Sequence, residues 1–271
     1  MARSGKKQAG LKFGPGRDNP NRDFVFKCCN LPKRGAIDVL IFSDSRSSNI
    51  KSINDSWSMR MFRYFKDKKM SVMLVVRPKE CTVFLTLVNF LESNKLYFKH
   101  LITEIGLVDF TPKKIEIIND ILDQKAVYFK KARFRVERLS KYLLSNGEIK
   151  DLYSIDFNRE RFKKEIADCI ERHSGNAILM GTLEVSQGIK IKRNRPKEFF
   201  TKLKDSNRFL AGICGMSGRI EYLYPFEGAA YRPEKLSYDG VHYTGLGHGQ
   251  IYKVIKEAFT AKGSPDRKPG K

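Results

Sequence analysis

The chain has 271 residues, of which 41% are hydrophobic and 11% aromatic, and it carries a formal net charge of +22. This length and hydrophobic content are enough to bury a sizeable core, which excludes a wholly disordered chain. The positive charge favours an acidic partner such as nucleic acid, anionic lipid or an anionic polysaccharide, without choosing among them.

The chain begins with residues 1–34, which are rich in Gly, Pro, Lys and Arg and have no hydrophobic periodicity. They predict a flexible basic N-terminal arm. The first apolar, β-branched run follows at 37–45 and ends in small polar residues, which is typical of a buried parallel strand. The segment 52–68 predicts a helix, because Ser56 can cap it and its apolar residues fall on one stripe.

Two further apolar runs, at 70–78 and 81–89, are of strand type. Only Lys79 and Glu80 separate them, and a parallel crossover needs far more chain. Either the two runs form a hairpin, or one of them is not a strand of the sheet. The stretch 93–173 is rich in both charge signs, and we expect it to form a helical insertion.

The remaining segments alternate between strand and helix character up to a short basic tail. They are a strand at 176–186, a helix at 196–214, a strand at 218–226, a helix at 247–262 and a flexible tail at 263–271. Such alternation predicts one α/β domain over 35–262, with a mostly parallel sheet covered by helices on both faces.

The five cysteines include no C-x-x-C pair, so the spacing of a zinc site is absent and we expect no metal centre. An odd number of cysteines fits a reducing compartment. The N-terminus has no apolar core for a secretory signal, and no stretch is long and apolar enough to span a membrane. We therefore expect a cytoplasmic protein.

Two groups of residues are candidates for chemistry. Ser43, Asp44 and Ser45 follow the first strand, and open α/β sheets bind ligands at the carboxyl ends of their strands. Serine and aspartate are also ordinary turn residues, so this group alone is a weak signal. Asp239 and His242, directly before the last helix, are more specific, because the carboxylate can orient the imidazole for proton transfer.

With these residues the chain resembles the SGNH/GDSL hydrolases. That family has a Gly-Asp-Ser block after its first strand, an Asn block after a central strand and an Asp-x-x-His block near its C-terminus. Here Ser43-Asp44-Ser45 matches the first block with Ser in place of Gly, and Asp239-Gly240-Val241-His242 matches the last. The resemblance covers about 36–260 apart from the insertion, and it implies a three-layer, flavodoxin-like α/β/α fold.

The resemblance also implies roles for individual residues. Ser45 would be the nucleophile, His242 the general base and Asp239 the group that orients the base. The Ser45 backbone N–H and the Asn89 side chain would stabilise the oxyanion. In the family this Asn usually stands between Gly and Asp, whereas Leu87, Val88 and Phe90 surround Asn89. The family also has a Gly in a separate block, normally an oxyanion donor, and no such Gly occurs between 69 and 81.

The implied activity is that of a serine-dependent acyl-ester hydrolase or O-acyltransferase acting on a carbohydrate or another polar ester. No cofactor is expected, although acyl-CoA would be the co-substrate of a transferase. Arg46, beside the nucleophile, could bind a carboxylate or phosphate of an anionic substrate. The alternative is a catalytically degenerate domain that binds nucleic acid, or another acidic partner, through its basic surface. The oligomeric state stays open.

Overall fold

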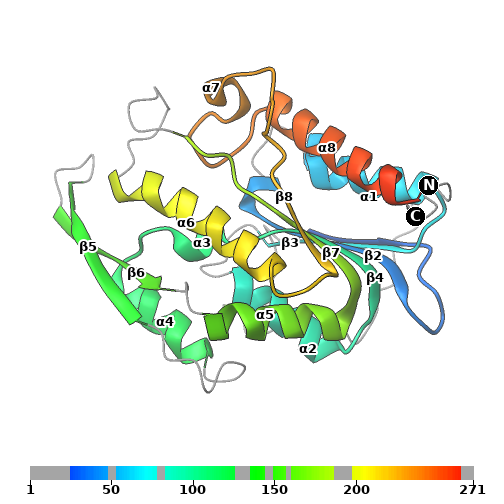
Figure 1. The fold of residues 1–271 in the computed structure, drawn as a ribbon, viewed down its shortest axis with the longest axis horizontal. Coiled ribbons are helices and arrows are strands. Elements are labelled where there is room, and N and C mark those ends of the chain that lie inside the picture. The colour runs from blue at the N-terminus through cyan, green and yellow to red at the C-terminus, as the bar shows by residue number, and fades with distance from the viewer. Residues whose placement is uncertain are drawn as a thin grey trace, which may run out of the picture.

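The computed structural model describes residues 25–47, 53–77, 83–125, 135–143, 149–156, 160–185 and 197–263. A six-stranded sheet in the order β1-β3-β2-β4-β7-β8 forms its centre (Figure 1). The strands are β1 Val25–Cys29, β2 Ile37–Asp44, β3 Val72–Arg77, β4 Phe98–Glu104, β7 Ser174–Met180 and β8 Ile220–Leu223. Only β1 is antiparallel to its neighbour in this sheet.

The five parallel strands, numbered along the chain, have the order 2-1-3-4-5. This is the order of flavodoxin-like folds, so the expected fold class is confirmed. The order places β2 between β3 and β4, where the direction of the connections reverses. Ligands of such folds bind at this point, outside the carboxyl ends of the strands.

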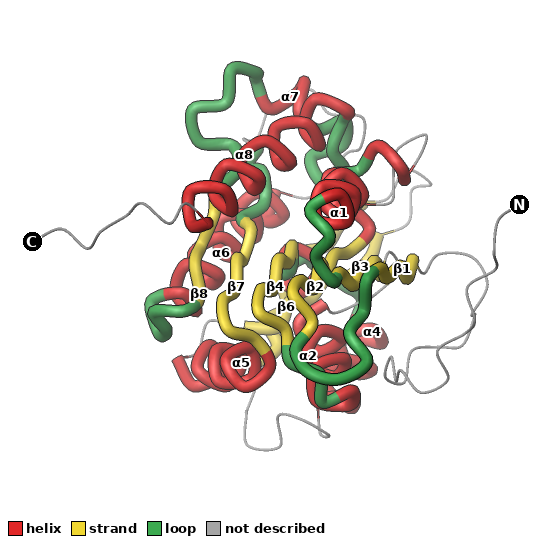
Figure 2. Tube along the Cα trace, turned by 90° about the vertical axis from the view of Figure 1, so that its right-hand side faces the viewer, coloured by secondary structure: helices red, strands yellow, loops and turns green. Residues whose placement is uncertain are grey.

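Helices cover both faces of the sheet (Figure 2). On one face lie α1 (Trp57–Asp67) and α8 (Gly245–Gly263), which pack on each other. On the other lie α2 (Val83–Asn94) and α5 (Glu160–His173), with α6 (Lys197–Cys214) beside α5 and β8. The expected helices at 52–68, 196–214 and 247–262 thus correspond to α1, α6 and α8.

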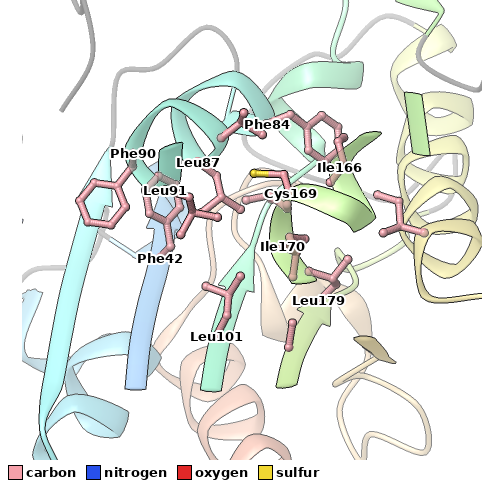
Figure 3. Close-up of a cluster of buried hydrophobic side chains, with 14 of the residues drawn as sticks. Phe42, Phe84, Leu87, Phe90, Leu91, Leu101, Ile166, Cys169, Ile170 and Leu179 are labelled. Atoms are coloured by element: carbon pink, nitrogen blue, oxygen red, sulfur yellow. The ribbon is translucent and has the colours of Figure 1, made fainter. Parts of the chain in front are cut away.

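Alternate side chains of β2 point into two different cores, as the pleat of a strand requires. Leu40 and Phe42 belong to the core under α2 and α5, whereas Val39 and Ile41 belong to the core under α1 and α8. Figure 3 shows Phe42 pointing from the sheet toward the apolar residues of α2, with Cys169 of α5 beside them. Burial on both faces explains why this strand is a continuous apolar run.

The strand expected at 81–89 is wrong, because this segment forms most of α2. Its side chains are buried around much of the helix, so the 3.6-residue periodicity that would reveal a helix is weak. The crossover from β3 to the parallel strand β4 also needs a long connection, which α2 supplies. The two apolar runs are therefore a strand and a helix, and Lys79 and Glu80 between them lie outside the described part.

The expected helical insertion at 93–173 is only partly correct. It contains the central strand β4 and an antiparallel hairpin, in addition to helices. Its other elements are α3 Leu107–Phe110, α4 Ile115–Lys125, β5 Arg135–Leu143, β6 Ile149–Asp156 and α5. The hairpin packs on α3 and α4, and α3 follows the carboxyl end of β4.

The expected arm at 1–34 is wrong at its end, because Val25–Cys29 pair with β3 as an edge strand. Residues 1–24 and 264–271, which include most of the expected arm and tail, lie outside the described part. None of the described helices is both long and apolar enough to cross a membrane.

Candidate active site

Ser45 lies at the carboxyl end of β2, where the strand passes into a single 3-10 turn, Ser45–Ser47. Asp44 holds this turn, since its Oδ1 accepts the backbone N–H of Arg46 at 2.9 Å. Ser45 is half-buried, whereas both of its chain neighbours are fully buried. The turn therefore presents the serine, and not its neighbours, at the edge of the sheet.

The loop before α8 holds Asp239 and His242 in a fixed arrangement. Asp239 Oδ1 accepts the backbone N–H groups of Val241 at 3.0 Å and His242 at 2.7 Å. The turn needs a positive φ of 78° at Gly240, a conformation that glycine adopts without strain. Ser237 closes the loop by donating its hydroxyl to the His242 carbonyl at 2.9 Å.

These two segments meet to form a proton relay. His242 Nδ1 lies 2.8 Å from Asp239 Oδ2, and His242 Nε2 lies 3.5 Å from Ser45 Oγ. Burial raises the pKa of Asp239, but hydrogen bonds from the His242 ring and backbone outweigh it and hold that pKa well below its usual value. An ionised Asp239 accepts the Nδ1–H, so Nε2 is left to accept the serine proton.

The distance between Ser45 and His242 is at the long end for a hydrogen bond, as is common in catalytic sites without substrate. The ring of Tyr238 stacks on the His242 ring at 5.8 Å between centroids and further restricts its orientation. The structure thus brings together the three residues that the sequence predicts as a triad.

Arg46 does not face the substrate side, contrary to expectation. Its side chain is 0% exposed, with Nε and Nη2 donating to the Asp44 carboxylate at 3.0 and 2.9 Å. Nη1 lies 3.5 Å from Glu104 Oε1 and donates to the hydroxyl of Thr182. A substrate anion would have to displace these partners, so the assignment of Arg46 as a substrate-binding residue is wrong.

Asn89 is also misplaced in the sequence prediction, because it lies inside α2 and not at the end of a strand. Near the start of α2, Asp109 accepts the backbone N–H of Phe84. Asn89 stands five residues after Phe84, which is about 8 Å further along the axis of the helix. Its Oδ1 is buried without a hydrogen-bond partner among the described residues. We therefore do not retain Asn89 as an oxyanion donor.

The central strand beside β2 is β4, and the residues after it include Gly106 and Asp109. Between that Gly and Asp, where the family has its Asn, stand Leu107 and Val108. Leu107 is buried and Val108 is half-buried in α3. The position that would carry an amide donor is therefore apolar, and of the expected donors only the Ser45 backbone N–H remains.

One cluster of possible metal ligands occurs among the described residues, away from the triad, between α2 and α5. Ligand atoms of Glu92, Cys169 and His173 lie within 4.8 Å of one another. Arg172 already hydrogen-bonds Glu92, and burial raises the pKa of Cys169 to about 12, which keeps its thiol protonated. These features are those of an ion pair beside a buried, protonated thiol between the two helices, so we assign no metal there.

The sequence prediction missed Glu104, which ends β4 and is buried behind Ser45. Its Oε2 accepts the indole N–H of Trp57 at 2.9 Å and lies 3.4 Å from Ser43 Oγ. The charge pattern of 93–173 predicts a helical insertion, which conceals Glu104 at the end of a strand. An acidic residue after the β-type residues Leu101, Ile102 and Thr103 is the signal that could have revealed it.

No protein-family model matches the sequence, and no curated protein is significantly similar to it. Among solved structures, TesA is similar at 9% identity over 83% of this chain and 98% of its own, with a TM-score of 0.48. LAE5, an alpha/beta hydrolase from the metagenome of Lake Arreo, Spain, is similar at 12% identity over 85% and 99%, with a TM-score of 0.47.

A catalytic mutant of Axe2, an acetylxylan esterase from Geobacillus stearothermophilus, is similar at 11% identity over 83% of this chain and 95% of its own, with a TM-score of 0.47. In this chain, the strand order agrees with the flavodoxin-like fold that the sequence resemblance implies. Ser45 follows the first parallel strand, and Asp239 and His242 precede the last helix. In fold and in the placement of these three residues, the chain resembles the SGNH/GDSL hydrolases.

Proposed function

We propose that the protein is a serine-dependent acyl-ester hydrolase or O-acyltransferase. The observation that carries this proposal is the chain of contacts from Ser45 through His242 to Asp239, with distances of 3.5 and 2.8 Å. The relay stands at the carboxyl edge of a parallel sheet, where such folds bind their ligands. An ionised, buried carboxylate behind an imidazole is what a general base for a serine nucleophile requires.

In this mechanism the Ser45 oxygen attacks the ester carbonyl carbon while His242 Nε2 takes the serine proton. Asp239 stabilises the imidazolium that forms, and the Ser45 N–H donates to the oxyanion of the tetrahedral intermediate. The intermediate collapses to an acyl-enzyme, and the leaving alcohol receives the proton from His242. Water or an acceptor hydroxyl then attacks the acyl-enzyme, with His242 again as base, and releases an acid or a new ester.

Labelling with a fluorophosphonate probe tests the nucleophile directly. We expect one labelled serine, Ser45, and no labelling in Ser45→Ala at unchanged melting temperature. Ser47 is the matched control, because it lies two residues away in the same turn but is buried against the Ser43 hydroxyl at 2.7 Å. Labelling that survives in Ser45→Ala, or that maps to Ser47, would contradict the assignment.

The acceptor of the acyl group separates the two activities. A hydrolase releases acetate from an aryl acetate in water, whereas a transferase forms an ester from acetyl-CoA and a glycan. The formal charge of +22 supports an anionic substrate for either, such as an acidic glycan or a phosphate-bearing acyl donor. Comparison of both reactions with wild type and Ser45→Ala assigns the class.

A second candidate is a non-catalytic domain that binds nucleic acid. The apolar residues Leu107 and Val108 favour it, since they stand where the family has an amide donor. If wild type is not labelled by the probe but binds RNA with an affinity that falls steeply with salt, this candidate replaces the first. Labelling at Ser45 would exclude it as the sole function.

A further inference from the structure

A cluster of buried charges lies directly behind Ser45, formed by the two residues that flank it and by Glu104. Asp44, Arg46 and Glu104 are each no more than 1% exposed. Burying charges is costly, and well-packed apolar groups are often as stable in their place, so a buried ion pair is weak evidence for stability alone. The position of this cluster next to the nucleophile therefore calls for a role other than stability.

The cluster fixes the backbone on both sides of Ser45. The Asp44 carboxylate accepts both the backbone N–H of Arg46 at 2.9 Å and its guanidinium Nη2 at 2.9 Å. Residues i−1 and i+1 of the nucleophile are thus tied to each other. The planar guanidinium can make these bonds in only one orientation, so Ser45 is held in one conformation between them.

Glu104 connects this turn to the histidine side of the site. It accepts the indole N–H of Trp57, and the Trp57 backbone N–H lies 3.3 Å from Nδ1 of His248 in α8. Tyr243, the residue directly after His242, is fully buried, and the pKa of its hydroxyl is raised by burial and then by the charge of Glu104. Glu104 thus lies 3.5 Å from Arg46 and is linked through Trp57 to His248, six residues after His242.

We propose that Arg46 and Glu104 act as a positioning pair, which sets the Ser45 hydroxyl at the correct distance from His242. The inference rests on the proposed function and adds two residues that do not touch substrate. Ser45 and His242 come from segments 197 residues apart, and their 3.5 Å separation leaves little tolerance. A displacement of the turn by about 1 Å can cost about 10²-fold in rate, which is the effect that the pair prevents.

The test compares Arg46→Met, Arg46→Lys and Glu104→Gln with wild type, using an aryl acetate and the fluorophosphonate probe. After correction for the folded fraction, we expect Arg46→Met to lower kcat and the labelling rate by about 10²-fold at nearly unchanged KM. Arg46→Lys should recover about tenfold of this, because an ammonium reaches Asp44 but cannot reproduce the fork. Glu104→Gln should cost about tenfold, since it keeps an acceptor for Trp57 but loses the carboxyl group that faces Arg46.

Asp38→Ala is the matched control. Asp38 is the second residue of the same strand, at the amino end opposite Ser45. There it accepts the N–H and hydroxyl groups of Ser71, both at 2.8 Å, and pairs with Lys99 at 2.7 Å. This variant should lose stability but keep wild-type kcat. If Arg46→Lys and Glu104→Gln lose stability as the control does, yet keep wild-type kcat and labelling, the pair is only structural and the proposal is overturned.

The nitrogen resonances of the His242 ring separate this proposal from the proposed function. If the wild type neither turns over ester nor reacts with the probe, the proposed function fails, but the ring still reports on its surroundings. Glu104→Gln and Arg46→Lys should then shift the His242 resonances, whereas Asp38→Ala should not. Unchanged His242 resonances in both variants would overturn the positioning role, whatever the activity of the wild type.

Discussion

Replacing Val108 by Asn should increase the rate of ester cleavage. Val108 is half-buried and stands between Gly106 and Asp109, and the family has its Asn between a Gly and an Asp. The Arg46 N–H is already bonded to Asp44, so it does not serve as an oxyanion donor beside the expected Ser45 N–H. One donor of this kind is worth about 10²–10³-fold in kcat, or about 3–4 kcal/mol of transition-state stabilisation.

We expect kcat to rise by about 10²-fold, the lower end of that range, because the surroundings of residue 108 in α3 are not arranged to orient an amide. The assay is kcat for an aryl acetate, with the fluorophosphonate labelling rate as a second measure. Leu107→Asn is the control: Leu107 is the neighbouring residue but is 1% exposed, so its amide would be buried and should only destabilise the fold. A folded Val108→Asn protein with no gain in kcat would refute the placement of residue 108 at the oxyanion.

Three further outcomes follow from the same geometry. His242→Ala should abolish activity about as completely as Ser45→Ala, because the residues of a triad act as a unit. Asp239→Asn should lower the rate by less than these variants, or at most by as much. A kcat near wild type in His242→Ala would exclude His242 as the base. The pKa of His248 is lowered from 6.5 to about 4, chiefly by burial and then by the charge of Arg60. The free energy of unfolding should therefore fall by about 3 kcal/mol as the pH drops from 6.5 toward 4, because the unfolded chain binds this proton first. Urea unfolding of His248→Gln should show a weaker decline over that range, and an unchanged decline would show that other groups cause it. Deleting residues 1–29 should lower the melting temperature, because it exposes the edge of β3; an unchanged value would show that β1 contributes nothing.

The triad could be predicted from the sequence because each half of it is local. Ser45 directly follows a strand that contains the apolar run Val39–Phe42, and Asp239 and His242 stand three residues apart before the last helix. The fold class places the end of the first strand and the start of the last helix at one edge of the sheet. The resemblance to the SGNH/GDSL hydrolases then joins the two halves as one triad, and the structure places Ser45 Oγ 3.5 Å from His242 Nε2.

The errors arise where burial removes the local signal. The segment 83–94 is apolar around most of its surface, so a buried helix and a buried strand give the same pattern there. The strand β4 carries Lys99 and His100 near its start, which disguise it within a charged region. The environment of Arg46 could not be predicted, because its partner Glu104 stands 58 positions away on a strand that the pattern did not reveal.

The unusual residues of the first block belong together once the structure is considered. The family has Gly where this chain has Ser43, and the Ser43 hydroxyl contacts both Ser47 and Glu104. A glycine could make neither contact, and without Glu104 the Arg46 side chain would lose one of its buried anionic partners. Ser43, Arg46 and Glu104 are therefore parts of one arrangement around the turn of Ser45, and we infer from the proposed function that the departure at residue 43 is another way of supporting the nucleophile. The loss of the amide donor at Val108 concerns the oxyanion and is separate from this support, so the two departures have to be tested apart.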